Sequence, residues 1–199
     1  MEIKLATLEH FDGIRALLKA NHVNTIDPER KKDGFVTTNL TDEQLTTLIV
    51  DKQGVTIAEE DGKVLAFALA ADWDYWSAWP FFQYMIEHLE EYQLNGETLT
   101  VENSYQYGPV CVDHSVRGTG VFEKVFHFSL ATMENRYPYM VTFVNQINPR
   151  SYNAHSNKAN MATSGTFDFN NNHICHTHNK YPGQCWLPPS LTHYCSRKY

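Results

Sequence analysis

The sequence has no surplus of basic residues. It holds 16 Lys and Arg against 23 Asp and Glu, a formal net charge of −7 with histidine counted as neutral. Proteins that bind nucleic acids neutralise phosphates with clustered Lys and Arg, so this balance argues against a nucleic-acid partner. It suits a positively charged small molecule such as an amine, although net charge speaks mainly to solubility and encounter rates.

A long apolar run is also missing. The longest stretch, Val64–Ala71, is far shorter than the roughly 20 residues that a membrane-spanning helix needs. The first residues, Met1–Ala6, lack the basic segment and apolar run of a secretion signal. We therefore expect a soluble, cytoplasmic protein that has no membrane partner.

Cysteine is scarce and confined. Of the 4 cysteines, three lie in the last 25 residues, so they cannot cross-link the whole domain, and we expect free thiols. The same tail gathers residues that are typical metal ligands: His173, Cys175, His176, His178, Cys185, His193 and Cys195. Their spacing forms no regular Cys-x-x-Cys pair. We expect no bound metal, and a metal-binding interaction protein remains an alternative.

Apolar periodicity and turn residues predict a mixed α/β domain in which a hairpin precedes a β-α-β unit. The expected order is strand, two helices, hairpin, helix, long strand, helix, strand, helix, strand. The expected segments are 3–7, a helix after 7, a helix after 41, 55–58 with 64–69, a helix after 80, 98–112, 117–134, 140–144, 149–157 and 166–169.

Two of these elements carry local signals. Asp61-Gly62 between apolar runs is typical of a two-residue hairpin turn, and Thr41 with Gln44 three positions later is typical of a helix capping box. After residue 172 no strand pattern is visible. The predicted organisation is therefore a domain over residues 1–172 and a divergent tail over 173–199.

One segment predicts a phosphate cradle. The strand Val110–Val112 leads through Arg117-Gly118-Thr119-Gly120 into a helix. Glycines at a helix start let backbone N–H groups approach a pyrophosphate, and an arginine can pair with phosphate oxygens bidentately. A Rossmann fingerprint would need a third glycine where Glu123 stands, and no Gly-Lys-Ser/Thr of a Walker loop occurs. An ordinary glycine turn is the remaining alternative.

The stretch Val110–Phe122 resembles the central motif of the GNAT N-acetyltransferase superfamily. The resemblance implies a mixed, mostly antiparallel twisted sheet flanked by helices, with two strands splayed at the site of its cosubstrate, acetyl-CoA. Phe122 stands where the family usually has Gly or Ala, so the loop must accommodate a large ring. The implied acetyl-CoA contacts are Val110, Cys111, Val112, Arg117, Gly118, Thr119, Gly120, Val121 and Phe122.

The segment Asn145–Lys158 resembles the family's stretch after the fifth strand. It implies that Asn148 bonds the pantetheine arm and that Ser151 lies near the phosphates, whereas helix capping is the alternative role of Asn148. Asn160 stands near the helix end where the family has Gly, and Asn also tolerates the left-handed conformation.

Acetyl transfer to an amine needs a base, stabilisation of the oxyanion and protonation of the departing thiolate. Glu102, on the expected long strand, is a candidate base, and a solvated carboxylate is its alternative reading. Tyr152 and His155 are candidates for a position at the thioester. The expected function is direct transfer of an acetyl group from acetyl-CoA to a primary amine, by a monomer or a homodimer. A non-catalytic acyl-CoA-binding domain of the same fold is the other alternative.

Overall fold

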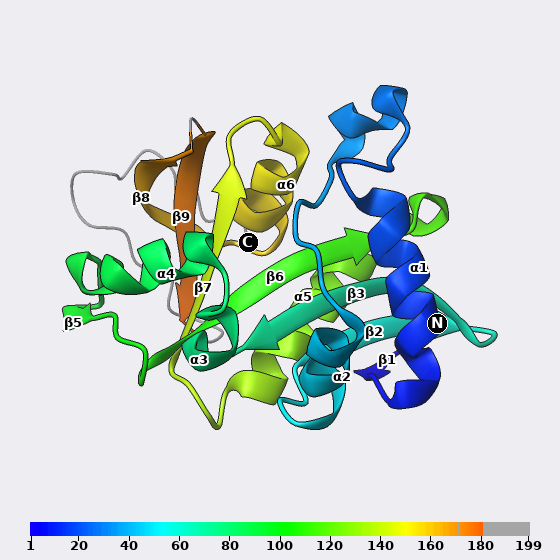
Figure 1. The fold of residues 1–199 in the computed structure, drawn as a ribbon, viewed down its shortest axis with the longest axis horizontal. Coiled ribbons are helices and arrows are strands. Elements are labelled where there is room, and N and C mark those ends of the chain that lie inside the picture. Colours follow the sequence, from blue (N-terminus) through cyan, green and yellow to red (C-terminus); the bar gives the residue numbers. More distant parts are fainter. Residues whose placement is uncertain (171, 181–199) are drawn as a thin grey trace. The chain divides into compact units, whose positions relative to one another are not determined.

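The computed structural model describes residues 1–170 and 172–180, and its elements are labelled in Figure 1. The chain forms a mixed α/β fold built on a seven-stranded sheet with the order β1-β2-β3-β6-β7-β9-β8. Strand β2 is antiparallel to β1 and β3, and β9 is antiparallel to β7 and β8. Strands β6 and β7 are parallel, from Ser104 opposite Tyr139 to Gln106 opposite Val141. The sheet is therefore mixed and mostly antiparallel, as predicted.

The described residues group into two compact units. The first comprises residues 1–70 and 108–133. Its elements are β1 (Glu2–Leu5), η1 (Leu8–His10), α1 (Phe11–Asn21), η2 (Pro28–Asp33), α2 (Asp42–Val50), β2 (Val55–Glu60), β3 (Lys63–Ala71, to residue 70), the second half of β6 (Ser104–Val112), η4 (His114–Val116) and α5 (Val121–Met133).

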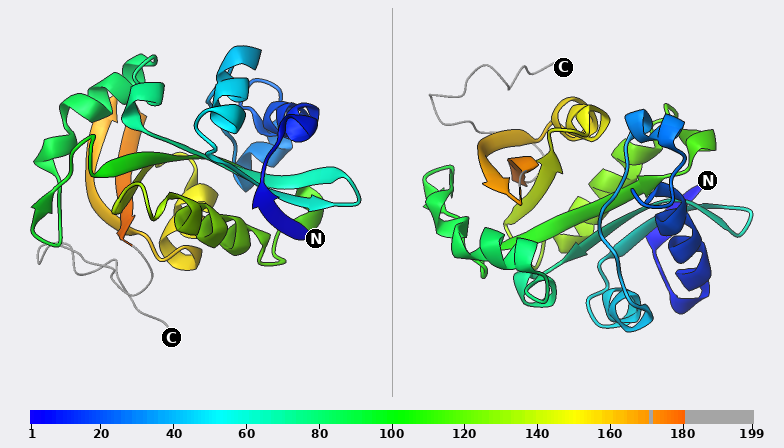
Figure 2. Two further views of the ribbon diagram at one scale, coloured as in Figure 1. Left: turned by 90° about the horizontal axis from the view of Figure 1, so that it is seen from below. Right: turned by 45° about the horizontal axis from the view of Figure 1, so that its top comes forward.

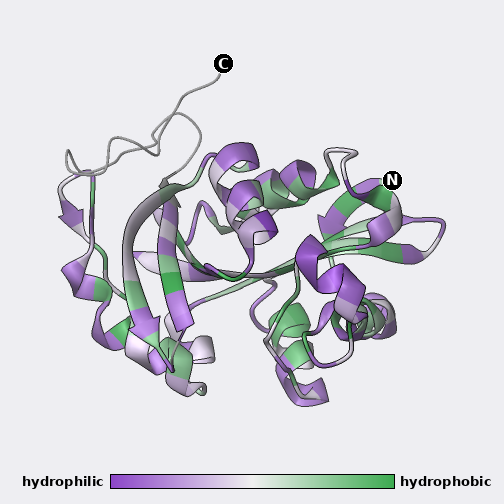
Figure 3. Ribbon diagram, turned by 90° about the horizontal axis from the view of Figure 1, so that it is seen from above, coloured by the Kyte–Doolittle hydropathy of each residue, from purple (hydrophilic) through white to green (hydrophobic). Residues whose placement is uncertain are grey.

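In this first unit, helices α1 and α2 cover one face of strands β1 to β3, and α5 covers the other (Figure 2). The helix α1 buries Ile14, Leu17 and Leu18, an i, i+3, i+4 set that forms one apolar face. The helices carry both hydrophilic and hydrophobic residues in Figure 3. On α5, Lys124 is exposed and Val125 is buried. Apolar helix faces on both sides of the strands form this unit's core.

The second unit comprises residues 71–107 and the described residues from 134 on. Its elements are α3 (Trp73–Trp76), α4 (Pro80–Glu87), η3 (Leu89–Glu91), β4 (Gln93–Leu94), β5 (Glu97–Thr98), the first half of β6, β7 (Tyr139–Asn145), α6 (Pro149–Asn153), the π-helical turn η5 (Ala154–Lys158), β8 (Ala162–Phe169) and β9 (Asn172–Lys180).

In this second unit, α4 and α6 lie on opposite sides of strands β7, β9 and β8 (Figures 1 and 2). Residues 73–84 are rich in aromatic side chains, and many of these pack here. Trp73 and Trp76 are almost fully buried, and the ring of Phe81 on α4 contacts Phe143 of β7 at 4.4 Å between centroids. These aromatic side chains therefore form core contacts between α4 and the strands.

Several local predictions are confirmed. Asp61 and Gly62 have φ of 51° and 75° and join β2 to β3 as the predicted hairpin. The backbone N–H of Gln44 donates to Oγ1 of Thr41 at 3.2 Å, and Oε1 of Gln44 accepts the N–H of Thr41 at 2.9 Å. Asn160 has a φ of 53°, the left-handed conformation expected just beyond the helix end.

The prediction that no strand follows residue 172 is wrong. The strand β9 (Asn172–Lys180) pairs with β7 on one side and β8 on the other. The sequence conceals it because the strand lies between two others and is covered on both faces, so Ile174, Cys175, His176, Thr177 and His178 are all buried. Buried central strands lack the polar alternation of half-exposed ones. Residues 181–199 of the expected tail, with Cys185, His193 and Cys195, lie outside the described residues.

The predicted long strand is also wrong in its first half. Residues 101–103 form a turn, and β6 begins only at Ser104. The side chain of Asn103 makes this turn, since its Oδ1 accepts the N–H of Thr100 at 2.8 Å and its Nδ2 donates to the carbonyl of Thr98 at 2.9 Å. Glu102 therefore lies in an exposed turn and not on the strand.

Candidate functional site

The predicted cradle lies in the first unit, between the end of β6 and the start of α5. The strand ends at Val112, and the carboxylate of Asp113 accepts the N–H and the hydroxyl of Ser115 at 2.9 and 2.6 Å. These bonds turn the chain into η4, and they lower the pKa of the Asp113 carboxyl. The turn thus begins from a fixed strand end.

Gly118 and Gly120 give the turn its shape. Their φ angles are +83° and +81°, which L-residues other than glycine adopt only at a cost. A Cβ at either position would meet nothing within 4 Å, so the backbone conformation, and not crowding within the protein, requires glycine. Gly118 and Thr119 are exposed, and their backbone is open to a ligand.

The helix α5 follows at once. The carbonyl of Gly120 accepts the N–H of Lys124 at 3.2 Å, the first bond of the helix. The backbone N–H groups in the first turn of an α-helix have no acceptor within that helix, and they carry partial positive charge. The start of α5, next to two positive-φ glycines of which Gly118 is exposed, has the features of an anion site.

Phe122 does not crowd this turn. Its side chain is buried, with 9% of its surface exposed, and its ring lies at 6.4 Å from that of Phe126 between centroids. The two aromatic residues are one helical turn apart, so Phe122 packs on the core side of α5. The large ring that departs from the family pattern is accommodated away from the loop.

Arg117 makes protein contacts that the sequence did not predict. Its Nε donates to the carbonyl of Val112 at 3.2 Å, and its two terminal nitrogens donate to the carbonyl of Asp33 and to Oδ1 of Asn21, both at 3.0 Å. Asn21 is buried and its amide donates to the carbonyl of Leu17 at 2.9 Å, which fixes its oxygen toward Arg117. These bonds tie the cradle to the end of α1. Phosphate pairing by Arg117 stays a prediction.

The strand before the cradle carries the other predicted contacts. Cys111 is buried, and Val110 and Val112 on either side are partly exposed. Burial raises the pKa of the Cys111 thiol above its usual range, against a smaller opposing effect of Arg117. A protonated, buried thiol is a poor nucleophile. Any contact of Cys111 with a ligand would therefore run through its backbone.

In the second unit, Asn148 caps α6. Its Oδ1 accepts the N–H of Ser151 at 3.2 Å, and Pro149 occupies the first helical position. Of the two roles expected for Asn148, the structure displays capping. The predicted contacts of Asn148 and Ser151 with a cofactor stay predictions.

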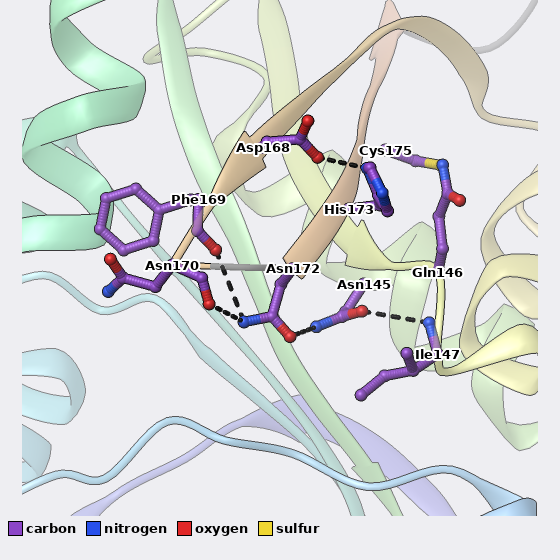
Figure 4. Close-up of polar contacts among 9 residues, drawn as sticks. All are labelled: Asn145, Gln146, Ile147, Asp168, Phe169, Asn170, Asn172, His173 and Cys175. Carbon is purple, nitrogen blue, oxygen red and sulfur yellow. Dashed lines mark hydrogen bonds and ion pairs between the residues drawn. The ribbon is translucent and has the colours of Figure 1, made fainter.

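The loop before this helix is held by a network of side chains, drawn in Figure 4. Oδ1 of Asn145 accepts the N–H of Ile147 at 3.1 Å, and its Nδ2 donates to Oδ1 of Asn172 at 2.9 Å. The backbone N–H of Gln146 donates to the carbonyl of His173 at 2.9 Å. The end of β7 and the start of β9 therefore position the entrance to α6.

His155 lies on the π-helical turn η5. Such turns are rare in proteins, and those that occur are often found at functional sites. Its Nδ1 is 2.8 Å from the carbonyl of Ser151, and since a carbonyl can only accept, Nδ1 carries the proton. The lone pair is then on Nε2. The side chain is 6% exposed, and burial lowers its pKa despite the bond to Ser151. His155 is thus a neutral imidazole with a basic nitrogen.

The other candidates have different surroundings. The hydroxyl of Tyr152 is 3.4 Å from Oγ1 of Thr163 on β8, and the ring of Tyr107 lies edge-on to His155 at 6.2 Å between centroids. Burial raises the pKa of Tyr107. The structure thus brings His155 together with Tyr107, a buried residue of β6. No pattern in the sequence linked these two residues, which lie far apart in the chain.

Comparison with solved structures identifies the fold. An N-acetyltransferase from Staphylococcus aureus is 20% identical, with 90% of this chain and 97% of that chain covered and a TM-score of 0.59. A GNAT-family acetyltransferase from Streptococcus agalactiae is 14% identical, with 90% and 94% covered and a TM-score of 0.58. The fold is that of the GNAT acetyltransferases.

The yncA structure from Salmonella typhimurium, solved with its cofactor acetyl-CoA, shares this GNAT fold. It is 13% identical, with 95% of this chain and 98% of that chain covered and a TM-score of 0.61. No protein-family model matches the sequence, and neither does any curated protein. At such low sequence identities, structural similarity establishes the fold only. The reaction has to be inferred from the residues of the site.

Two further observations concern a metal site and a membrane-spanning helix. Within residues 1–170 and 172–180, no three His, Cys, Asp or Glu side chains group together as a metal site would require. No helix in that part of the chain is long and apolar enough to cross a membrane.

Proposed function

We propose that the protein transfers the acetyl group of acetyl-CoA directly to a primary amine. The observation that carries the proposal is the cradle: exposed backbone at Gly118 and Thr119, two positive-φ glycines and the start of the 13-residue helix α5. This combination fits a pyrophosphate, because its donors are backbone N–H groups and its surroundings hold no side chain at the glycines. The GNAT fold supports the same ligand.

Acetyl-CoA supplies an activated acyl thioester. The protein has to accept a proton from the amine and to protonate the departing thiolate. We assign to His155 the acceptance of the proton that the amine loses. Its Nε2 holds the lone pair and its lowered pKa keeps it neutral at neutral pH, which a base requires. Tyr152, on α6 one turn before His155, has a hydroxyl that can return a proton to the departing thiolate.

Glu102 fits the role of base less well. It lies in an exposed turn and not on the strand that leads to the cradle. The buried Cys111, with its raised pKa, offers no thiolate for an acyl-enzyme route. Both observations favour direct transfer with a histidine base.

The test is release of the CoA thiol from acetyl-CoA in the presence of a panel of primary amines. We expect amine-dependent release, and a fall of about 100-fold in kcat for His155→Gln with unchanged affinity for acetyl-CoA. Glu102→Gln is the matched control and should keep its rate. Binding of acetyl-CoA without thiol release from any amine would instead favour the non-catalytic acyl-CoA-binding domain.

A further inference from the structure

Two asparagine side chains join the turn between β8 and β9 to the entrance of α6 (Figure 4). Asn172 is the first residue of β9, and its Nδ2 donates to the carbonyl oxygens of Asn170 at 3.0 Å and Phe169 at 3.5 Å. Its Oδ1 accepts Nδ2 of Asn145, the last residue of β7, at 2.9 Å. The side chain of Asn172 therefore spans the distance from the β8–β9 turn to the end of β7.

Backbone partners fix which end of each amide carries the oxygen. The N–H of Ile147 can only donate, so the atom of Asn145 that it contacts at 3.1 Å is Oδ1, and Nδ2 is left for Asn172. The carbonyls of Phe169 and Asn170 can only accept, so they face Nδ2 of Asn172. Its Oδ1 is thereby turned toward Asn145. Donor and acceptor thus match at every contact of the pair.

Asn145 holds the start of α6 at two points. Its Oδ1 accepts the N–H of Ile147, and its backbone carbonyl accepts the N–H of Asn148 at 2.9 Å. Asn148 is buried, and it accepts the N–H of Ser151 at Oδ1 and the N–H of Tyr152 at its carbonyl, at 3.2 and 3.1 Å. The first turn of α6 therefore rests on Asn145.

His155 lies toward the far end of this helical segment. The helix α6 has 5 residues and η5 has 5 more. A helix this short is not stable alone in water, so contacts at its ends set its direction. His155 follows Asn148 by seven positions, or about 10 Å at the helical rise. A tilt of about 6° at the entrance would move the ring of His155 by roughly 1 Å, and such a misplacement can slow a reaction about 100-fold.

We propose that Asn145 and Asn172 are positioning residues for acetyl transfer. Through the bond between them, the β8–β9 turn sets the direction of α6 and with it the place of His155. The inference rests on the proposed function, in which His155 accepts the proton of the amine. In this role neither asparagine reacts, and both act through α6.

The first test needs no reaction. Asn145→Asp keeps the oxygen that accepts a backbone N–H but turns a second oxygen toward Oδ1 of Asn172, and Asn172→Leu removes the same bond at similar size. Hydrogen exchange followed by NMR should show the amides of Ser151 and Tyr152 exchanging roughly fivefold faster in both variants. Asn170→Asp, an exposed position in the same turn with the same change of charge, is the matched control and should keep the parent's rates.

The exchange rates decide whether the two asparagines hold α6. Parental rates in both Asn145→Asp and Asn172→Leu would overturn this hold, whether or not acetyl transfer is observed. Equally fast exchange in Asn170→Asp would overturn it too, because the effect would then come from any added charge in the turn.

The second test asks whether the hold acts through His155. The far end of the segment keeps its own bond, from the N–H of Met161 to the carbonyl of His155 at 3.0 Å, so we expect less than the full loss. In Asn145→Asp, kcat at saturating acetyl-CoA should fall roughly tenfold. The rate is counted per acetyl-CoA-binding site from a calorimetric titration, so that a loss of folded protein does not lower it.

The same substitution in the His155→Gln background supplies the control. There Asn145→Asp should leave kcat unchanged, because the group that it positions is absent. An equal fall in both backgrounds would overturn the action through His155. A parent that releases no thiol with any amine would overturn the proposed function and the positioning role in it, while the exchange rates would still decide the hold on α6.

Discussion

The bonds of Arg117 lead to a prediction about stability in the absence of any ligand. If its guanidinium ties the cradle to α1, removing it should destabilise the folded protein. Three hydrogen bonds of 3.0 to 3.2 Å are lost, one of them to the buried Asn21. Bonds that involve a charged group contribute about 1.5–3 kcal/mol each. Because Arg117 is half-buried, water can form some of the lost hydrogen bonds in the variant. We therefore expect the free energy of unfolding to fall by roughly 2–4 kcal/mol for Arg117→Met.

The assay is thermal unfolding followed by circular dichroism, without acetyl-CoA. For a chain of this size 1 kcal/mol corresponds to about 2–4 °C in Tm, so Arg117→Met should unfold roughly 5–15 °C below the parent. Arg117→Lys, which keeps the charge but not the planar fork, should recover part of the difference. Lys124→Met, an exposed position on α5, is the matched control and should keep its Tm. An unchanged Tm for Arg117→Met would refute the positioning role and leave Arg117 as a phosphate ligand only.

Three further predictions concern the fold. Gly54→Ala should prevent stable folding, because a Cβ there would lie 1.7 Å from a backbone carbonyl oxygen of β3; a soluble variant with the parent's Tm would contradict the described backbone. Gly165→Ala should lower the free energy of unfolding by about 1–3 kcal/mol, since Tyr92 must move, and chemical denaturation measures it. Acid should destabilise the protein through His176: its pKa is about 3 when folded and about 6.5 when unfolded. The unfolded state therefore binds more protons, and stability is lost as pH falls from 6.5 toward 3. His176→Phe should flatten that part of the stability profile, and an unaltered slope would speak against the burial of His176.

Features that depend on neighbouring residues were predictable from the sequence. The hairpin turn at Asp61-Gly62, the capping box of Thr41 and the cap at Asn148 each need only a few residues in a row, and all three form. The glycines of the cradle belong to the same class, because their positive φ is set within the turn.

Features that depend on distant partners were not predictable. Asn21 lies 96 positions from Arg117, so nothing in the local motif announces their bond. The sequence of β9 is polar and rich in histidine, and its strand is stabilised by pairing with β7 and β8. Residues 98–101 alternate like a strand, and the side-chain bonds of Thr100, Asn103 and Ser104 turn the chain there. Local patterns thus described the elements, while tertiary pairing decided where they begin and end.

The placement of the acetyl-CoA phosphates is the central claim, and a charge change in the exposed turn tests it most directly. Thr119→Glu puts a carboxylate beside the first turn of α5, and Thr119→Gln has the same size without charge; both lose the bond from the Thr119 hydroxyl to the carbonyl of Val116. Calorimetric titration with acetyl-CoA should give an affinity at least about tenfold weaker for Thr119→Glu than for Thr119→Gln, through repulsion of the phosphates. Equal affinities of the two variants would contradict this placement, because the pyrophosphate would then bind elsewhere.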